Sequence, residues 1–473
     1  MTEATQADQP LHCEVFVAGG GPAGSTIAAL LAERGRDVVV VEKDRHPRFH
    51  IGESLLPLNV LLFEKLGIKD KIERIGLHKY GAEFTSPQHG GIVTLEFSKA
   101  WDRNYPYSYH VRRSEFDQVL FEHCVEKGAR GVQGTRVIDV DLRADCVVIT
   151  TKDEDGNEQR WHAQFLVDAS GRDTLLANKL GMKRKNLKHN SAALYGHFVG
   201  AERQPGKRAG NISMFWFDHG WFWYIPLRDG TTSVGAVCWP YYLKSRKTDP
   251  TTFFLQTIAL SPPLAERLKN ATMINEATAT GNYSYQAEHM VGERYIMVGD
   301  AFAFIDPVFS SGVYLAMNSA FAGAEVVDTW LRDRRAAQPL MKRFDRDIRH
   351  GIRSFSWFIY RMTSPAMRNL FLNPHNPLRM QEALLSLLSG DLFRGTPIYW
   401  SLRAFKGVYY ITSLANLRRC VLAWWRRKKA IQEVSEYVTS TAAAVEEQST
   451  VTSEMSNGMQ QAAAEAASIG QAA

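Results

Sequence analysis

The sequence of 473 residues has little cysteine and no long hydrophobic run. Its five cysteines are scattered and odd in number, so they indicate neither a disulfide framework nor a metal site, and a reducing cytoplasm is expected. No apolar stretch approaches the ~20 residues of a membrane-spanning helix. The polar start, residues 1–10, does not resemble a signal peptide. A cytoplasmic protein is therefore expected, and its 45% hydrophobic content is enough to bury a large core.

Charge of one sign is missing from the end of the chain. From residue 430 onward there is no Lys, Arg or Asp but six Glu, so with a net charge of +6 overall the first 429 residues carry +12. Arg418, Arg419 and the basic run 426–429 flank the Trp-containing segment 421–425. Residues 418–429 therefore suit a membrane headgroup surface, the acidic helix of a carrier protein, or a packed helix with a solvated cationic end. No recognised binding module accompanies the charge, so nucleic acid is not an expected partner.

The N-terminal region contains a dinucleotide-binding pattern. An apolar strand at residues 15–18 runs into a glycine-rich turn and a helix at 25–34, and a second apolar strand at 38–41 ends in Glu42. The turn fits G-x-G-x-x-G with Gly19, Gly21 and Gly24. Glycines there permit a tight turn and close backbone approach to a pyrophosphate on the helix N-terminus. Glu42 is placed to accept hydrogen bonds from a ribose hydroxyl.

Three later segments resemble FAD-binding segments of the flavoproteins with two dinucleotide folds. Residues 295–301 form an apolar strand that ends in Gly-Asp, and in that family the matching Asp300 holds the ribityl chain. Residues 165–172 resemble the D-x-x-G segment, which assigns Asp168 to cofactor binding. Arg113 resembles the arginine that anchors the cofactor. The G-E-S core of residues 48–57 places Ser54 beside the flavin, although it also suits the cap of a helix that runs on to Leu66.

Within that superfamily, three motifs resemble the flavin-dependent halogenases that act on tryptophan, phenols and pyrroles. The W-x-W-x-I-P motif contains Trp221 and Trp223, which lie on one face of an extended strand and wall off one side of a flavin pocket; an isolated W-x-W also suits a core strand. Residues 304–312 are similar to a segment beside the flavin ring that contributes to the halide site. They supply Pro307 next to the cofactor, and Ser311 and Gly312 as halide-binding residues. Lys79 matches K-x-G-x-x-F, and its alternative is a solvated surface lysine.

The resemblance implies an FADH2-dependent halogenase. Such an enzyme forms hypohalous acid from a flavin C4a-hydroperoxide and chloride or bromide, and a buried lysine with a lowered pKa then captures the oxidant or hydrogen-bonds it beside an electron-rich ring. The expected substrate is a small phenolic or pyrrolic compound, free or tethered to an acidic carrier protein. No second glycine-rich unit is evident for a nicotinamide, so a separate flavin reductase is expected as a partner. The alternatives are an FAD-dependent aromatic hydroxylase, a reductase of isoprenoid double bonds, and a flavin-bearing signalling protein.

The expected architecture is α/β, with a Rossmann-like FAD-binding domain interleaved with a β-sheet substrate domain and followed by a helical extension. The FAD-binding domain is assigned to residues 11–182 and 278–331, with an inserted substrate-side segment at 80–109. The substrate sheet is assigned to 183–277 and the helical extension to 332–436. The tail, 437–473, has a composition typical of a loose helix or a disordered segment.

Overall fold

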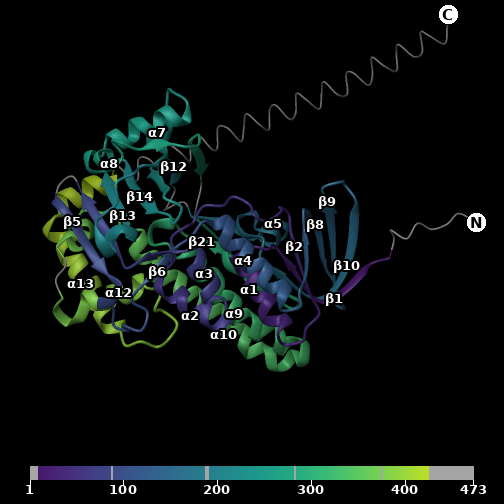
Figure 1. The fold of residues 1–473 in the computed structure, drawn as a ribbon. Coiled ribbons are helices and arrows are strands. Elements are labelled where there is room, and N and C mark those ends of the chain that lie inside the picture. Colours follow the sequence, from purple (N-terminus) through teal and green to yellow (C-terminus); the bar gives the residue numbers. More distant parts are fainter. Residues whose placement is uncertain (1–8, 87–88, 187–190, 282–283, 374–375, 426–473) are drawn as a thin grey trace, which may run out of the picture.

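The computed structural model describes residues 9–86, 89–186, 191–281, 284–373 and 376–425. Two eight-stranded sheets lie beside one another, and helices cover them (Figure 1). This arrangement confirms the α/β fold class, with a sheet of dinucleotide-binding type, a second antiparallel sheet and a helical C-terminal region. The expectations for the basic run 426–429 and for the tail 437–473 lie outside the described residues.

The first sheet is the FAD-binding sheet, with strand order β19-β20-β10-β1-β2-β7 and the pair β8–β9 added at β10. Its strands are β1 (Leu11–Ala18), β2 (Val38–Glu42), β7 (Arg130–Gln133), β8 (Thr135–Leu142), β9 (Val147–Asp153), β10 (Glu158–Asp168), β19 (Val291–Gly292) and β20 (Tyr295–Met297). The neighbours of β1 and β2 run parallel. Strand β2 lies between β1 and β7, and its sequence VVVVE is apolar up to Glu42, as is typical of a strand covered on both faces. Every residue of β2 is buried.

The second sheet is the substrate sheet, with order β16-β12-β15-β14-β13-β4-β5 and β17 beside β12. Its strands are β4 (Gly81–Ser86), β5 (His89–Glu96), β12 (Ala192–Val199), β13 (Ile212–Phe217), β14 (Gly220–Pro226), β15 (Thr232–Cys238), β16 (Thr272–Met273) and β17 (Thr278–Gly281). The segment containing β4 and β5 joins this sheet through the parallel pair β13–β4. The sheet is therefore assembled from segments that are far apart in the sequence.

Two small sheets connect the large ones. One is β3 (Leu77–Lys79) with β6 (Ser108–His110), and the other is β11 (Lys183–Lys185) with β18 (Tyr285–Ala287) and β21 (Ala303–Phe304). Residues 183–185, which we had assigned to the start of the substrate sheet, thus pair outside it.

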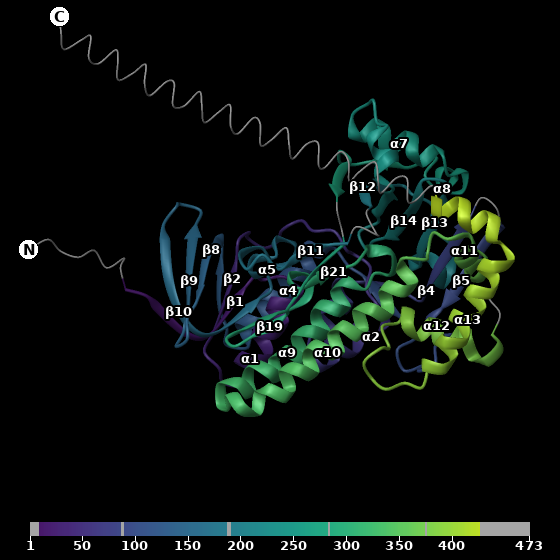
Figure 2. The same cartoon turned by 180° about the vertical axis from the view of Figure 1, so that it is seen from behind.

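The helices differ in the sheet they cover. One group of helices packs on the FAD-binding sheet: α1 contacts α4 and α9, and α10 packs along α9 (Figure 2). The other group packs on the substrate sheet and includes α11, α12 and α13 at its outer end. The helices of the FAD-binding half are α1 (Pro22–Ala32), α2 (Pro57–Leu66), α3 (Lys69–Ile75), α4 (Arg113–Glu126), α5 (Leu175–Lys179), α9 (Gly312–Arg332) and α10 (Arg334–Ile359). The others are α6 (Pro240–Lys244), α7 (Pro250–Ala259), α8 (Pro262–Arg267), α11 (Pro365–Leu372), α12 (Met380–Leu388) and α13 (Tyr399–Ala415).

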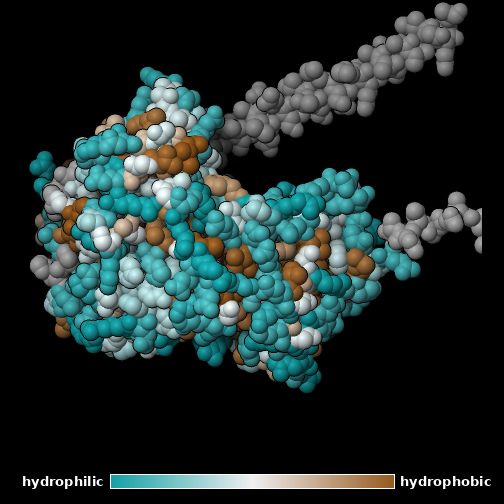
Figure 3. All heavy atoms as spheres, in the orientation of Figure 1, coloured by the Kyte–Doolittle hydropathy of each residue, from teal (hydrophilic) through white to brown (hydrophobic). Residues whose placement is uncertain are grey.

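The surface seen in Figure 3 is mostly hydrophilic, with small hydrophobic patches scattered between polar residues. Among the described residues, no helix has the length and apolar character needed to cross a membrane.

Candidate active site

A cavity of about 670 Å³ extends from the glycine-rich turn after β1 to strand β14. Its volume lies within the range typical of sites for cofactors and other small molecules. Of the residues singled out in the sequence, those that line it are Gly19, Gly21, Glu42, Ser54, Arg113, Trp221, Trp223, Asp300, Pro307 and Gly312. The cavity therefore brings together residues at the carboxyl ends of strands of the FAD-binding sheet and residues of the substrate sheet.

The glycine-rich turn is shaped for close packing and for an anion. A Cβ atom on Gly19 would lie 2.4 Å from the carbonyl oxygen of Ala169, and one on Gly24 would lie 1.8 Å from the carbonyl oxygen of Gly19. Gly21 instead faces the cavity at the N-terminus of α1, where no side chain caps the helix. The first NH groups of α1 are thus available to the phosphates of a dinucleotide. Gly24 does not line the cavity; it lies against the backbone of Gly19 and the side chain of Ala169, and so lets α1 pack closely on the turn.

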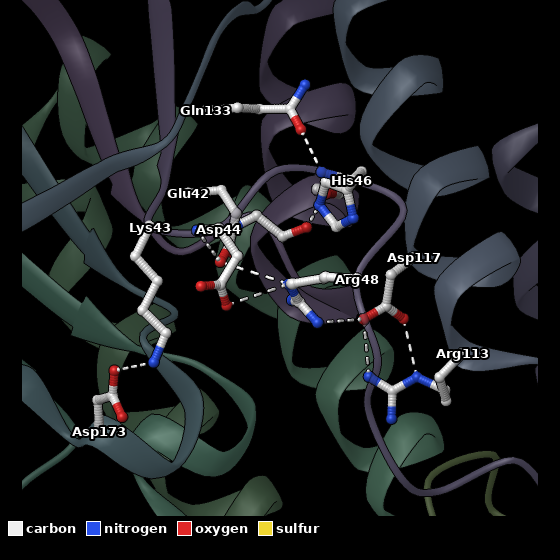
Figure 4. Close-up of polar contacts among 11 residues, drawn as sticks. Glu42, Lys43, Asp44, His46, Arg48, Arg113, Asp117, Gln133 and Asp173 are labelled. Atoms are coloured by element: carbon white, nitrogen blue, oxygen red, sulfur yellow. Dashed lines mark hydrogen bonds and ion pairs between the residues drawn. The ribbon is translucent and has the colours of Figure 1, made fainter. Parts of the chain in front are cut away.

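An ionic cluster forms one wall of the cavity (Figure 4). Arg113 donates two hydrogen bonds to Asp117, from Nε to Oδ1 at 2.8 Å and from Nη2 to Oδ2 at 3.0 Å. Arg48 lies between Asp117, at 3.1 Å from Nη1 to Oδ2, and Glu42, at 3.4 Å from Nε to Oε1. Glu42 also accepts a 2.7 Å hydrogen bond from the backbone NH of Gly20. The two arginines outweigh the effect of burial and hold the pKa of Asp117 below its ordinary value.

Asp168 ends β10 and Asp300 follows the neighbouring parallel strand β20, but the two carboxyl groups have different surroundings. Asp300 lines the cavity, and burial raises the pKa of its carboxyl to about 6 although Arg113 and Arg172 act in the opposite direction. Asp168 is fully buried and does not line the cavity. Its carboxylate accepts hydrogen bonds from Ser170 and from the backbone NH of Leu176. Asp168 therefore shapes the loop 169–173, whose residues do line the cavity.

The two tryptophans of β14 share a face, as alternation along the strand predicts. Trp221 and Trp223 line the cavity together with Ile225, and their ring centroids are 6.2 Å apart. The intervening Phe222 and Tyr224 belong to a separate core on the other side of the sheet. The indole of Trp223 lies over Gly235, where a Cβ would be 2.1 Å from the ring, and its Nε1 donates to Ser233 Oγ at 3.2 Å. The indoles are therefore fixed as one wall of the cavity.

Lys79 is buried, with 2% of its surface exposed, so the solvated-lysine interpretation is wrong. It does not itself line the cavity but lies behind Ser54, which does. Its Nζ donates to Ser54 Oγ at 2.9 Å and to the carbonyl oxygen of Leu55 at 3.0 Å. Burial lowers the pKa of Lys79 to about 7, and among the described residues no carboxylate opposes that shift. The neutral ring of His110, whose pKa is held well below its ordinary value by burial and by Lys79, lies nearby.

The segment before α9 approaches the cavity through its backbone turn. Ser310 adopts a left-handed conformation with φ of 57°, and Ser310 and Gly312 line the cavity together with Pro307. Ser311 is buried at the N-cap of α9 and does not line the cavity, because the turn at Ser310 directs it into the protein. Ser310, rather than Ser311, is thus the serine that reaches the cavity.

Two further features of the site were missed in the sequence. The first is Arg48 with its partner Asp117, which had one available signal: Asp117 follows Arg113 at the i, i+4 spacing of an ion pair on a helix. The second is a buried pair, in which Glu53 Oε1 lies 2.8 Å from His197 Nε2. Glu53 lines the cavity, whereas His197 lies on β12, 144 positions later. No local pattern connects them.

Comparison with known proteins agrees with this geometry. Residues 12–348 match a family model described as an FAD binding domain. A chlorinase from Pseudomonas fluorescens that is named for 1H-pyrrole-2-carbonyl-[peptidyl-carrier protein] is 29% identical over 81% of this chain and 90% of that protein. Flavin-dependent halogenase armH4 of Armillaria mellea is 35% identical over 70% of this chain and 68% of that protein. Among solved structures, the myxobacterial chondrochloren halogenase CndH is 32% identical with a TM-score of 0.72, covering 86% of this chain and 97% of that chain.

Proposed function

Since this chain belongs to the flavin-dependent halogenases of the FAD-binding domain family, we propose that it halogenates an electron-rich phenol or pyrrole with chloride or bromide. The observation that carries this proposal is Lys79, a buried amine with a lowered pKa directly behind the cavity wall.

The cavity wall fits FAD. The open N-terminus of α1 at Gly21 suits the pyrophosphate, Glu42 at the end of β2 suits the ribose of the adenosine, and Asp300 suits the ribityl chain. Arg113, held by Asp117, fixes the loop through a 2.8 Å hydrogen bond from Nη1 to the carbonyl oxygen of Ile51. We assign the flavin ring to the end of the cavity lined by Trp221, Pro307 and Gly312. Backbone groups at Ser310 and Gly312 are the candidate halide ligands.

Reduced FAD, dioxygen and a halide supply hypohalous acid, a small and indiscriminate oxidant. The indoles of Trp221 and Trp223 keep a bulky aromatic substrate from the flavin side, so direct hydroxylation is suppressed. Lys79, on the far side of Ser54, then holds the oxidant next to the substrate. This separation of two compartments is the physical reason for selectivity in the proposed reaction.

Lys79 performs the transfer in two balanced steps. Its neutral Nζ attacks the halogen, so that an N–X bond forms, the O–X bond breaks, and the hydroxide leaves with the amine proton as water. The aromatic carbon next attacks the halogen, the N–X bond breaks, and the ring proton returns to Nζ. A pKa of about 7 leaves half of the amine neutral at pH 7, whereas an ordinary lysine is almost wholly protonated there. Hydrogen bonding of the oxidant by Nζ is the alternative form of the same step.

We propose that the phenol or pyrrole reaches the enzyme either as a free small molecule or attached to a carrier protein. The Pseudomonas relative is named for a pyrrole on a peptidyl carrier, and this chain covers most of that protein. A flavin reductase is the proposed source of reduced FAD.

The direct test is incubation with FAD, a flavin reductase, bromide and a panel of phenols, pyrroles, carrier-bound pyrrole and tryptophan. Mass spectrometry then reads the bromine isotope pair in the product. We expect bromination of a phenol or pyrrole that depends on both reductase and halide. Halide-independent oxidation of NADPH by the protein alone, with a hydroxylated or reduced product, would instead identify a hydroxylase or a double-bond reductase.

A further inference from the structure

The C-terminal arm, residues 399–425, carries the densest group of exposed hydrophobic side chains in the described part of the chain. It consists of α13 and a following helical stretch, 417–425, at the outer edge of the substrate sheet (Figures 1 and 2). The exposed apolar residues of the arm are Tyr399, Trp400, Tyr410, Ile411, Leu414, Leu417, Val421, Leu422, Trp424 and Trp425. Such a concentration is unusual for a surface that contacts only water.

The arm has an inner and an outer face. Phe405 and Tyr409 attach the inner face to α10, with ring centroids 5.6 Å from Phe358 and 5.3 Å from Trp357. On the outer face Trp400 is 73% exposed and Leu414 is 69% exposed. The positions 400, 403, 407, 411 and 414 follow one face of α13 at three- and four-residue steps, and 418, 421 and 425 follow one face of the helical stretch after the break at Asn416. Together these positions are called the outer stripe. The hydrophobic face is therefore presented outward by a scaffold that is itself anchored.

Charge indicates what the outer face binds. From residue 392 to residue 432 the sequence has nine Lys and Arg and no Asp or Glu. Arg403 and Arg418 lie within the exposed stripe, and the guanidinium of Arg403 lies 4.7 Å from the ring centroid of Tyr399. A second copy of this chain would bring two sets of like charges together, which opposes self-association. A surface of negative charge with an apolar interior satisfies both the cations and the tryptophans.

We propose that the C-terminal arm binds an anionic lipid membrane as a peripheral anchor. Trp and Tyr side chains prefer the level of the lipid headgroups, and Lys and Arg are attracted by acidic lipids. The arm lies flat on the surface with its outer stripe in the interface, while Phe405 and Tyr409 keep it attached to the enzyme. This inference does not depend on which substrate the cavity accepts.

The experiment is sedimentation of the full chain with vesicles of phosphatidylcholine alone and of phosphatidylcholine mixed with phosphatidylglycerol. We expect binding to the mixed vesicles that weakens at high salt, and little binding to the neutral ones. Substituting three exposed apolar residues of the stripe, Trp400→Ser with Leu414→Ser and Trp425→Ser, should weaken binding by roughly 100-fold. The control is Ile138→Ser with Leu255→Ser and Leu260→Ser, which removes three exposed apolar side chains elsewhere and should leave binding unchanged.

A charge variant separates the electrostatic part. Arg418→Gln with Arg419→Gln should weaken binding to the mixed vesicles by roughly 30-fold, whereas Arg343→Gln with Arg346→Gln, two exposed arginines on α10, should not. All four variants should keep the turnover of a free substrate. Equal binding to both vesicle types, or none, would overturn the proposal. So would an oligomer, or a complex with an acidic carrier protein, that forms without vesicles and is lost in the apolar stripe variant.

Discussion

Arg113 and Lys79 are two buried cations that both donate hydrogen bonds to the loop of residues 51–55, yet their other partners differ. Arg113 donates to the carbonyl oxygen of Ile51 and is paired with Asp117, whereas Lys79 donates to Ser54 and to the carbonyl oxygen of Leu55. Arginine keeps its charge in protein interiors and needs a carboxylate when it is buried. Lysine can instead lose its proton, and burial lowers the pKa of Lys79 to about 7. A carboxylate partner thus keeps Arg113 charged in the interior, whereas Lys79, which lacks such a partner among the described residues, can lose its proton.

The largest expected effect is on the reaction and comes from Lys79→Met. This variant keeps the length of the side chain but removes the amine, so halogenation should fall by roughly 10²- to 10⁴-fold, the range that a positioned catalytic group contributes. FAD binding and the release of hydrogen peroxide should persist. Product analysis, FAD titration and a peroxide assay measure the three quantities. The control is Lys65→Met on the exposed side of α2, and retained product formation in Lys79→Met would remove Lys79 from the mechanism.

The corresponding change at the other cation, Arg113, is the loss of its carboxylate partner in Asp117→Ala. It leaves Arg113 buried without its carboxylate, so the free energy of unfolding should fall by about 3–5 kcal/mol. FAD affinity should fall as well, because both Arg113 and Arg48 lose their anchor. Urea denaturation and FAD titration measure these changes. The control is Asp139→Asn, whose carboxylate pairs with Lys179 at the surface and whose loss should change neither quantity measurably. An unchanged stability in Asp117→Ala would end the contrast between the two cations.

A third variant tests whether the cofactor side and the substrate side of the site are separate compartments. In Trp223→Leu the indole over Gly235 is lost, and the wall that we propose to separate cofactor from substrate becomes thinner. The share of reduced FAD that ends as hydrogen peroxide or hydroxylated product should rise by roughly 3- to 10-fold relative to halogenated product, since the cost of one lost wall contact is modest. Chromatography of products from one reaction measures this ratio. Phe222→Leu, on the opposite face of β14, should leave the ratio unaltered.

The pH dependence also distinguishes Lys79 from Arg113. A lowered folded-state pKa means that the unfolded chain binds the Lys79 proton more tightly, so its contribution to stability rises with pH between about 7 and the ordinary value of 10.5. The slope should be up to about 1.4 kcal/mol per pH unit, measured as wild type minus Lys79→Met. The rate of halogen transfer should likewise rise up to about pH 7 and then level, if the neutral amine is the acceptor. A rate that falls above pH 7 would assign the role to the ammonium form.

The smallest expected effect is that of removing residues 441–473. If residues 9–425 contain both the cofactor site and the substrate site, FAD affinity and turnover of a free substrate should remain at the level of the full chain. Loss of either would mean that the tail contributes to the enzyme. Loss of a cellular partner without loss of turnover would instead support a signalling role for the tail.

The sequence was most informative where the chemistry is local. The strand, turn and helix around Gly19 and Gly21 can be recognised because their spacing follows from backbone geometry. The shared face of Trp221 and Trp223 likewise follows from the two-residue period of a strand. Where a partner lies far along the chain, local pattern fails. Asp168 lies in a recognisable segment, but its carboxylate binds its own loop, and the serine that reaches the cavity is Ser310, because one left-handed residue turns Ser311 inward.

The amino-acid pattern alone thus determined a dinucleotide-binding α/β fold with a double-tryptophan strand, because spacing and alternation are properties of neighbouring residues. The resemblance of further segments to known flavoproteins identified the dinucleotide as FAD. Tertiary structure alone decided that Lys79 loses its solvent, that Arg48 joins Glu42 to Asp117, and that Glu53 meets His197. The physical reason is that a pKa and an ion pair depend on burial and on charges brought near by packing. Neither quantity belongs to any single segment of the chain.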